Sequence, residues 1–286
     1  MIKAQEKGRP AGHHAALLLA MLLFSNPYVM AQAPTFADPQ VPVIRIDANG
    51  FDASEADIRA IVSSAGRELW RFFPGYRIEP IVVTRGRSGP ISLFQRNAKN
   101  EIVMRLDTSQ TLWSQYSYQF AHEFCHVLCG YDQDDSGNLW FEETLCETAS
   151  LFAMRAMARS WKTDPPYSNW KDYRDALRNY TDQVIAKRTN LAEIHGKGLA
   201  AFYQKHQATL RKKSTERELN GAMAIVLLHL FEKQPTHWEA VRWLNSKPSP
   251  AGETFEQYLK KWYGAVPPRH QPFVKTLAEL YGLKAD

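Results

Sequence analysis

The strongest constraint on the fold of this chain is the pentapeptide HEFCH. Its two histidines, His122 and His126, are four residues apart. Residues with this spacing lie on one face of an α-helix, where their rings can converge on a single ion. The flanking residues favour a helix that begins near Thr108 or Ser109 and ends at Gly130, because glycine is common directly after the last helical turn. The pentapeptide therefore predicts a helix that carries a metal site.

The spacing H-E-x-x-H is typical of catalytic zinc sites. Zinc binds imidazole nitrogen and lowers the pKa of its bound water toward about 7. Glu123 lies about 100° around the helix from His122, where its carboxylate can take a proton from that water and return it later. We therefore predict His122 and His126 as zinc ligands and Glu123 as the general base and acid.

A catalytic zinc site needs a third protein ligand and keeps one position open. The segment WFEETLCETAS, residues 140–150, supplies two carboxylates one helical turn apart, Glu143 and Glu147. We predict that Glu143 is the third ligand and that Glu147 accepts a hydrogen bond from a ligand histidine. Glu142 is followed at the same distance by Cys146, a poor acceptor, so we expect the replacement of Glu142 to have little effect on metal binding.

HEFCH followed by WFEETLCE resembles the gluzincin metallopeptidases, in which the third zinc ligand is a glutamate on the next helix. Aminopeptidase-like members have the pattern W-x-N-E-G-x-A-E, which matches the zinc glutamate to Glu143 and the supporting acid to Glu147. Glu142 and Thr144 replace its asparagine and glycine. The resemblance covers about residues 40–150 and implies a zincin-like fold, with a five-stranded mixed sheet above the cleft, helices below it, and hydrolysis of peptide bonds.

A later segment, ELNGAMAIVLLHL, resembles the gluzincin helix that brings a tyrosine to the substrate oxyanion, three residues before a glycine. The residue at that position here is Glu218, and other candidates for the role are Tyr203, His229 and Tyr263. The departure at Glu218 leaves an alternative function open. In that alternative the chain is a non-catalytic zincin-like module that holds a metal and binds a peptide or a surface partner.

Two other metal sites can be drawn from the same part of the sequence. The segment 132–143 has the oxygen spacing of an EF-hand calcium loop, and its acidic residues would also suit a calcium ion beside the zinc site: Asp132, Asp134 and Asp135. A closed structural zinc site would combine the histidines with Cys125 and Cys129. Because four ligands on one helix cannot surround a tetrahedral ion, this alternative needs Cys146 as well.

The three cysteines are Cys125, Cys129 and Cys146, and in an oxidising compartment one pair can close. Cys146 follows Glu143 by three residues, so we expect it to face the helix of the two histidines. We predict a disulfide from Cys146 to Cys125 or Cys129, with one buried thiol left over.

The remaining periodicity predicts an α+β fold. Apolar residues favour a strand at 41–47, a helix at 54–73 capped by Ser54, a strand at 78–84 and a hairpin formed by 91–96 and 101–106. The rest of the chain has helical periodicity, in segments near 140–160, 168–187, 190–212, 216–232, 235–245, 253–263 and 270–282. We therefore predict a zincin-like lobe at 42–160 and a helical lobe at 161–286.

The first residues predict secretion. Residues 1–31 have a basic start, a short apolar run and small residues before Gln32, which is typical of a cleaved signal peptide. We expect 32–41 to be a disordered lead-in. The chain is thus expected to be secreted or periplasmic, with no stable membrane insertion. Its formal charge of +5 is modest and its basic runs lack interleaved aromatic residues, so we expect a peptide or protein substrate and no nucleic acid.

Overall fold

The computed structural model of the chain describes residues 42–131 and 137–286. The predicted signal peptide at 1–31, the lead-in at 32–41 and the calcium candidates Asp132, Asp134 and Asp135 lie outside these residues. In the part that is described, no helix is both long enough and apolar enough to cross a membrane.

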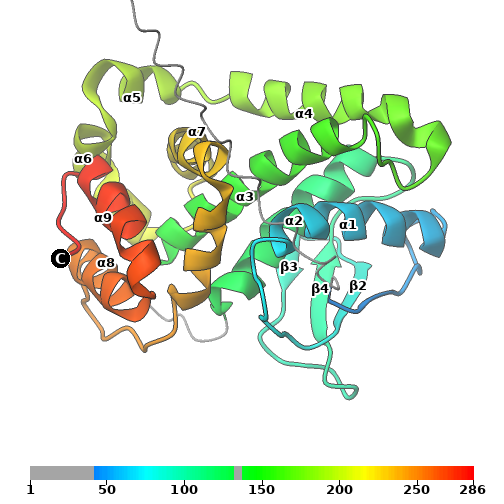
Figure 1. Cartoon of the computed structure of the whole chain (residues 1–286), viewed down its shortest axis with the longest axis horizontal. Helices are drawn as coiled ribbons and strands as arrows, with labels where there is room; N and C mark the ends of the chain where they lie inside the picture. Colours follow the sequence, from blue (N-terminus) through cyan, green and yellow to red (C-terminus); the bar gives the residue numbers. More distant parts are fainter. Residues whose placement is uncertain (1–41, 132–136) are drawn as a thin grey trace, which may run out of the picture. The chain divides into compact units, whose positions relative to one another are not determined.

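A small mixed sheet is built from the first part of the described chain (Figure 1). Its strand order is β1-β2-β4-β3, where β1 (Ile44–Ile46), β2 (Ile81–Arg85) and β4 (Ile102–Leu106) are parallel and β3 (Ile91–Ser92) runs antiparallel to β4. The predicted strands and the predicted hairpin are confirmed. The gluzincin resemblance implied five strands, whereas the sheet of the described residues has four.

Two helices pack on each other and against this sheet, α1 (Glu55–Trp70) and α2 (Trp113–Cys129). Ser54 caps α1 as predicted, because its Oγ accepts a hydrogen bond of 3.1 Å from the backbone N–H of Asp57. The helix of the two histidines is α2. It ends at Gly130, which has a φ of 73°, as predicted. It begins later than predicted, because Gln110 has a φ of 54° that a right-handed helix cannot contain.

The next helix, α3 (Leu139–Ser160), connects the sheet region with the helices that follow. It packs on α1 and α2 on one side and on α7 (Arg217–Lys233) on the other. A helix between two such neighbours must be apolar on most of its surface, and α3 has buried residues on every side. One continuous core joins the residues before and after position 160.

The predicted helical segments of the second half are confirmed, and the fold class is α+β (Figure 1). The predicted segment 190–212 is two helices, because Gly198 separates them with a φ of 83°. The remaining α-helices are α4 (Arg174–Ala186), α5 (Leu191–Lys197), α6 (Leu199–Lys212), α8 (Phe255–Ala265) and α9 (Gln271–Leu280). The segments η2 (Ser168–Tyr173), η3 (Pro235–Trp243) and η4 (Pro268–His270) are 3₁₀-helices.

An aromatic cluster fixes the first turn of α3. Trp140 is fully buried, and its ring centroid lies 4.6 Å from that of Phe255, 5.4 Å from Tyr203 and 6.0 Å from Tyr281. Its Nε1 has no hydrogen-bond partner among the described residues. Packing rather than hydrogen bonding therefore holds Trp140 in place.

We expect Trp140→Ala to lower the free energy of unfolding by about 3–5 kcal/mol, because the change removes buried apolar surface and leaves a cavity. Trp140→Phe keeps most of the packing and removes an unsatisfied N–H, so it should cost clearly less. Urea unfolding of both variants measures the difference. Equal destabilisation by the two substitutions would contradict this account of the cluster.

Candidate metal centre

The packing of α2 on α3 brings two histidines and a glutamate together. His122 Nε2 lies 3.3 Å from Glu143 Oε2, and His126 Nε2 lies 3.8 Å from Glu143 Oε1. Ligand atoms about 2.0–2.1 Å from one tetrahedral zinc ion lie roughly 3.3 Å from one another. Two imidazoles and a carboxylate are also ligand types that zinc binds. These three side chains therefore bring two imidazole nitrogens and two carboxylate oxygens together, and both are donor types that a metal ion can bind.

A fully buried carboxylate orients one of these histidines. Glu142 Oε1 lies 2.5 Å from His126 Nδ1, and Glu142 Oε2 accepts a hydrogen bond of 2.5 Å from Asn245 Nδ2. Asn245 Oδ1 in turn accepts one of 2.7 Å from the Tyr258 hydroxyl. A carboxylate at Nδ1 directs the Nε2 lone pair of a histidine toward a metal. In the structure this contact is made by Glu142, whereas the sequence assigned it to Glu147 and expected little from Glu142.

The carboxylates make this position strongly attractive for a cation. Burial alone would lower the pKa of His126, but the hydrogen bond to Glu142 and the charges of Glu142, Glu143 and Glu123 raise it to about 10. Burial favours the neutral form of Glu143, yet the hydrogen bond with His122 and the nearby positive charges lower its pKa. The surroundings therefore favour positive charge on His126 and negative charge on Glu143.

Glu123 lies between the two histidines in the sequence and next to the sheet in space. Glu123 is 4% exposed, and its backbone oxygen accepts a hydrogen bond of 3.3 Å from Ser92 Oγ on the edge strand β3. No described residue donates a hydrogen bond to its carboxylate. The carboxylate therefore keeps its capacity to accept a proton from a bound molecule.

Glu147 takes part in a separate polar network. It accepts hydrogen bonds from Arg188 Nη2 at 2.7 Å and from the Tyr118 hydroxyl. Arg188 Nη1 also donates to Glu218 at 3.0 Å. A Cβ at Gly221 would lie 2.2 Å from Arg188 Nε, so only a residue without a side chain lets the guanidinium reach this place. Glu218, at the position of the gluzincin tyrosine, is thus part of an ion pair.

The other candidates for the oxyanion role have structural partners. Tyr203 is buried and stacks on Trp140, and burial raises its pKa. His229 Nδ1 lies 3.0 Å from the backbone oxygen of Ile225 in its own helix. These contacts engage Tyr203 and His229, and Tyr263 is partly buried against the core.

The three cysteines lie together beneath the histidines. All are fully buried free thiols, so the predicted disulfide is not formed in this structure. Cys125 Sγ lies 4.0 Å from Cys129 Sγ. Burial alone would raise the pKa of Cys125, but hydrogen bonds with Cys129 and Cys146 lower it to about 6, whereas burial raises the pKa of Cys146 well above its ordinary value. The thiols therefore form one coupled cluster.

Cys146 also belongs to a group that can hold a metal. One ligand atom each from His122, His126 and Cys146 lie within 4.8 Å of one another. Glu143 and Cys146 are three residues apart on α3, as neighbours on one face of a helix are. The centre therefore offers a thiol as well as a carboxylate.

The sequence did not predict the supporting residues Asn245, Tyr258 and Arg188. Arg188 follows α4, Asn245 follows η3 and Tyr258 lies in α8, and none stands in a recognisable motif. Glu142 could have been considered for this role from the sequence, because it is a carboxylate directly before Glu143. Glu142 approaches Nδ1 of His126 and Glu143 approaches Nε2 of both histidines. This assignment depends on how α3 is rotated about its axis, and local sequence does not specify that rotation.

We expect Glu142→Ala to weaken zinc binding by about 10–100-fold, because loss of an outer hydrogen-bond partner of a ligand histidine typically costs that much. Glu147→Ala is the matched control, since Glu147 lies on the same helix and bonds to Tyr118 and Arg188 instead. Chelator competition gives both zinc affinities. The assignment of Glu142 fails if Glu147→Ala weakens zinc binding as strongly.

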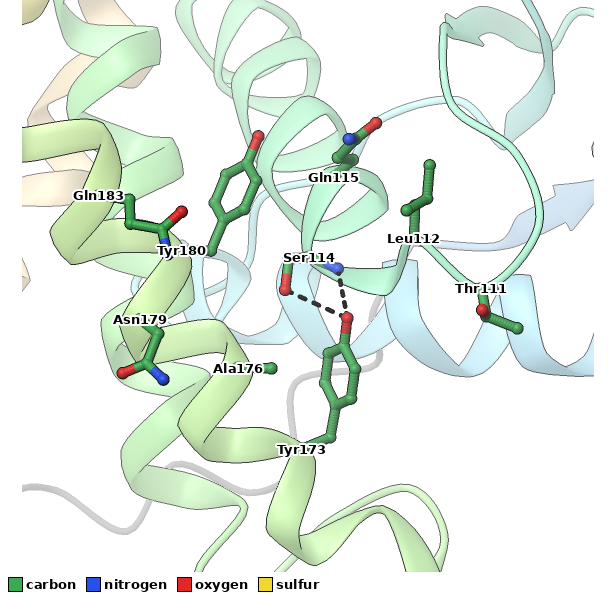
Figure 2. A pocket seen from close by; sticks show the side chains of 9 residues that line it. All are labelled: Thr111, Leu112, Ser114, Gln115, Tyr173, Ala176, Asn179, Tyr180 and Gln183. Carbon is green, nitrogen blue, oxygen red and sulfur yellow. Dashed lines mark hydrogen bonds between the residues drawn. The ribbon is translucent and has the colours of Figure 1, made fainter. Parts of the chain in front are cut away.

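An open pocket of about 380 Å³ lies between the first turn of α2 and α4 (Figure 2). The Tyr173 hydroxyl lies 3.2 Å from both the backbone nitrogen and the Oγ of Ser114. Tyr180, which also lines the pocket, contacts Tyr118 edge to face. The lining residues are Thr111, Leu112, Ser114, Gln115, Tyr173, Ala176, Asn179, Tyr180 and Gln183. None of the predicted site residues is among them.

Comparison of the chain with models of known protein families, with curated proteins and with solved structures found no match. The likeness to gluzincins therefore stays a resemblance in two short motifs. The structure itself defines an α+β protein with a group of side chains on α2 and α3 that can hold a metal ion.

Proposed function

We propose that this chain is a secreted zinc-dependent hydrolase that cleaves peptide bonds. In this proposal His122, His126 and Glu143 hold the metal, and Glu123 carries the proton. The observation that carries the proposal is the approach of Glu143 to both Nε2 atoms, at 3.3 and 3.8 Å, while Glu142 occupies the other ring nitrogen of His126. Secretion rests on the predicted signal peptide at 1–31.

Bound zinc would supply a Lewis acid that polarises a substrate carbonyl and lowers the pKa of water. The residues of the chain would do the rest. Glu142 holds His126 in the tautomer that presents Nε2 to the ion. Glu123, whose carboxylate no described residue bonds, would accept a proton from the attacking water and pass it to the leaving nitrogen.

The edge of the sheet supports a peptide as the substrate. β3 pairs with β4 on one side only, and the hydrogen bond from Ser92 places this strand next to Glu123. An extended peptide can add to an exposed sheet edge through main-chain hydrogen bonds. Ile91 and Phe94 are 49% and 67% exposed and would contact its side chains.

The experiment that tests the proposal combines metal analysis of the purified chain with cleavage of an unbiased peptide library. We expect about one zinc per chain and cleavage that a chelator abolishes and added zinc restores. A chain that holds zinc but cleaves no member of the library, whether its cysteines are reduced or oxidised, would count against hydrolysis.

A second candidate function is metal binding without turnover. The group of His122, His126 and Cys146 favours it, because a thiolate is a strong zinc ligand and structural sites use four protein ligands. In this case the zinc would stabilise the packing of α2 on α3. Thermal unfolding with and without zinc, measured beside the cleavage assay, separates a structural role from a catalytic one.

A further inference from the structure

Cys146 lies close enough to the two histidines to be a further donor of the candidate metal centre. A ligand atom of Cys146 lies within 4.8 Å of ligand atoms of His122 and His126, and the residue is fully buried. Glu143 lies one turn before it on the same helix and within 3.3–3.8 Å of the same histidines. The two helices therefore present four donors, two from α2 and two from α3.

Four donors are enough to fill a tetrahedral zinc ion, and thiolate sulfur binds zinc at about 2.3 Å. Such a set would leave no position for a water molecule or a substrate. We propose that Cys146 is a removable fourth donor of this centre, which closes it in the reduced chain and opens it when the thiol is withdrawn. This inference rests on the proposed function and adds a regulation of the same site.

The neighbouring thiols of Cys125 and Cys129 can remove the Cys146 sulfur from the metal by forming a disulfide with it. Cys125 and Cys129 lie 4.0 Å apart at their sulfurs, and Cys146 is a fully buried free thiol of the same core, on the helix that packs against theirs. A sulfur bonded to another cysteine no longer carries the thiolate charge that binds a metal. A disulfide between Cys146 and either α2 thiol would therefore remove the fourth donor and leave His122, His126 and Glu143 in place.

The oxidant for this step is hydrogen peroxide, which is small enough to reach a buried thiol. An α2 thiolate attacks one peroxide oxygen, the oxygen–oxygen bond breaks, hydroxide leaves and a sulfenic acid forms. The thiolate of Cys146 then attacks the sulfenic sulfur and releases a second hydroxide. In total two cysteine thiols lose two protons and two electrons, and one hydrogen peroxide becomes two water molecules.

Cobalt substitution tests the donor directly. Co²⁺ is added to the reduced chain without oxygen, and the thiolate-to-cobalt charge-transfer band is recorded in the near ultraviolet. We expect the band in the parent and in the matched controls Cys125→Ser and Cys129→Ser, and its loss in Cys146→Ser. No band in the parent, or a band that survives in Cys146→Ser, would overturn the proposal.

Oxidation tests the withdrawal. After treatment with a slight excess of hydrogen peroxide we expect the parent to lose two hydrogens by mass, to lose the band, to keep one cobalt per chain, and to hydrolyse faster when loaded with zinc. Cys146→Ser should be as active before treatment as after it. A parent that keeps its band after forming the disulfide would overturn the gating.

The two proposals fail in different ways. If the parent shows no band but hydrolyses peptides, Cys146 is not a donor and the proposed function stands. If the band behaves as expected but neither the oxidised parent nor Cys146→Ser hydrolyses any peptide, the proposed function is wrong, and so is the gating of catalysis.

Discussion

Glu123→Gln is expected to lower hydrolysis by about 10²–10⁴-fold, the typical contribution of a general acid–base group, while the chain keeps its metal. Gln has the size of Glu and cannot take up a proton at neutral pH. Glu123 lies beside both histidines and receives no hydrogen bond from a described residue at its carboxylate. Its replacement therefore removes the proton carrier without breaking a structural contact.

The measurement is the turnover number of parent and variant on a peptide found in the library, together with zinc content and urea unfolding. The control is Glu218→Gln, because Glu218 is 55% exposed at its side chain and, among the described residues, bonds only to Arg188. We expect this control to remain within a few-fold of the parent. A confirmed activity that Glu123→Gln leaves intact would rule out the proposed mechanism.

Glu143→Ala is expected to weaken zinc binding by more than about 100-fold. Loss of a residue that only hydrogen-bonds to a ligand costs at most about that much, and loss of a ligand should cost more. The substitution removes the oxygen atoms that approach both histidine nitrogens. Hydrolysis at limiting zinc should be lost with the metal. If Glu143→Ala bound zinc as tightly as the parent, the third ligand would have to be sought in Cys146.

The control for this second prediction removes the same charge at a greater distance from the histidines. Glu218→Ala eliminates one carboxylate from α7 and should change the zinc affinity by only a few-fold. Chelator competition under reducing conditions compares the two variants with the parent. Equal losses in both would show that Glu143 acts through its charge rather than as a ligand.

Much of the fold follows from local periodicity. The positions of α1, α3 and α7 agree with the predicted segments because each helix repeats its apolar residues at helical spacing. The start of α2 was predicted too early because the left-handed conformation of Gln110 leaves no mark in the sequence.

Part of the candidate metal centre could likewise be predicted from the sequence, and part could not. His122, Glu123 and His126 stand within one turn and a half of α2, so helical geometry alone places them together. Glu143 was selected through its distance from Glu147, and the structure does bring Glu143 to both histidines. Glu147 itself has partners on α2 and after α4, which no spacing within its own segment indicates.

The sequence by itself determined the fold class, the order of the helices and the histidine pair, because these depend on contacts between residues that are close along the chain. The tertiary structure alone decided that Glu142 bonds His126, that Asn245 supports Glu142, and that Cys146 lies among the metal donors. Adjacent residues of a helix point about 100° apart, so the rotation of α3 assigns their roles. That rotation is set by packing of Trp140 against Tyr203, Phe255 and Tyr281, residues that follow it by more than sixty positions.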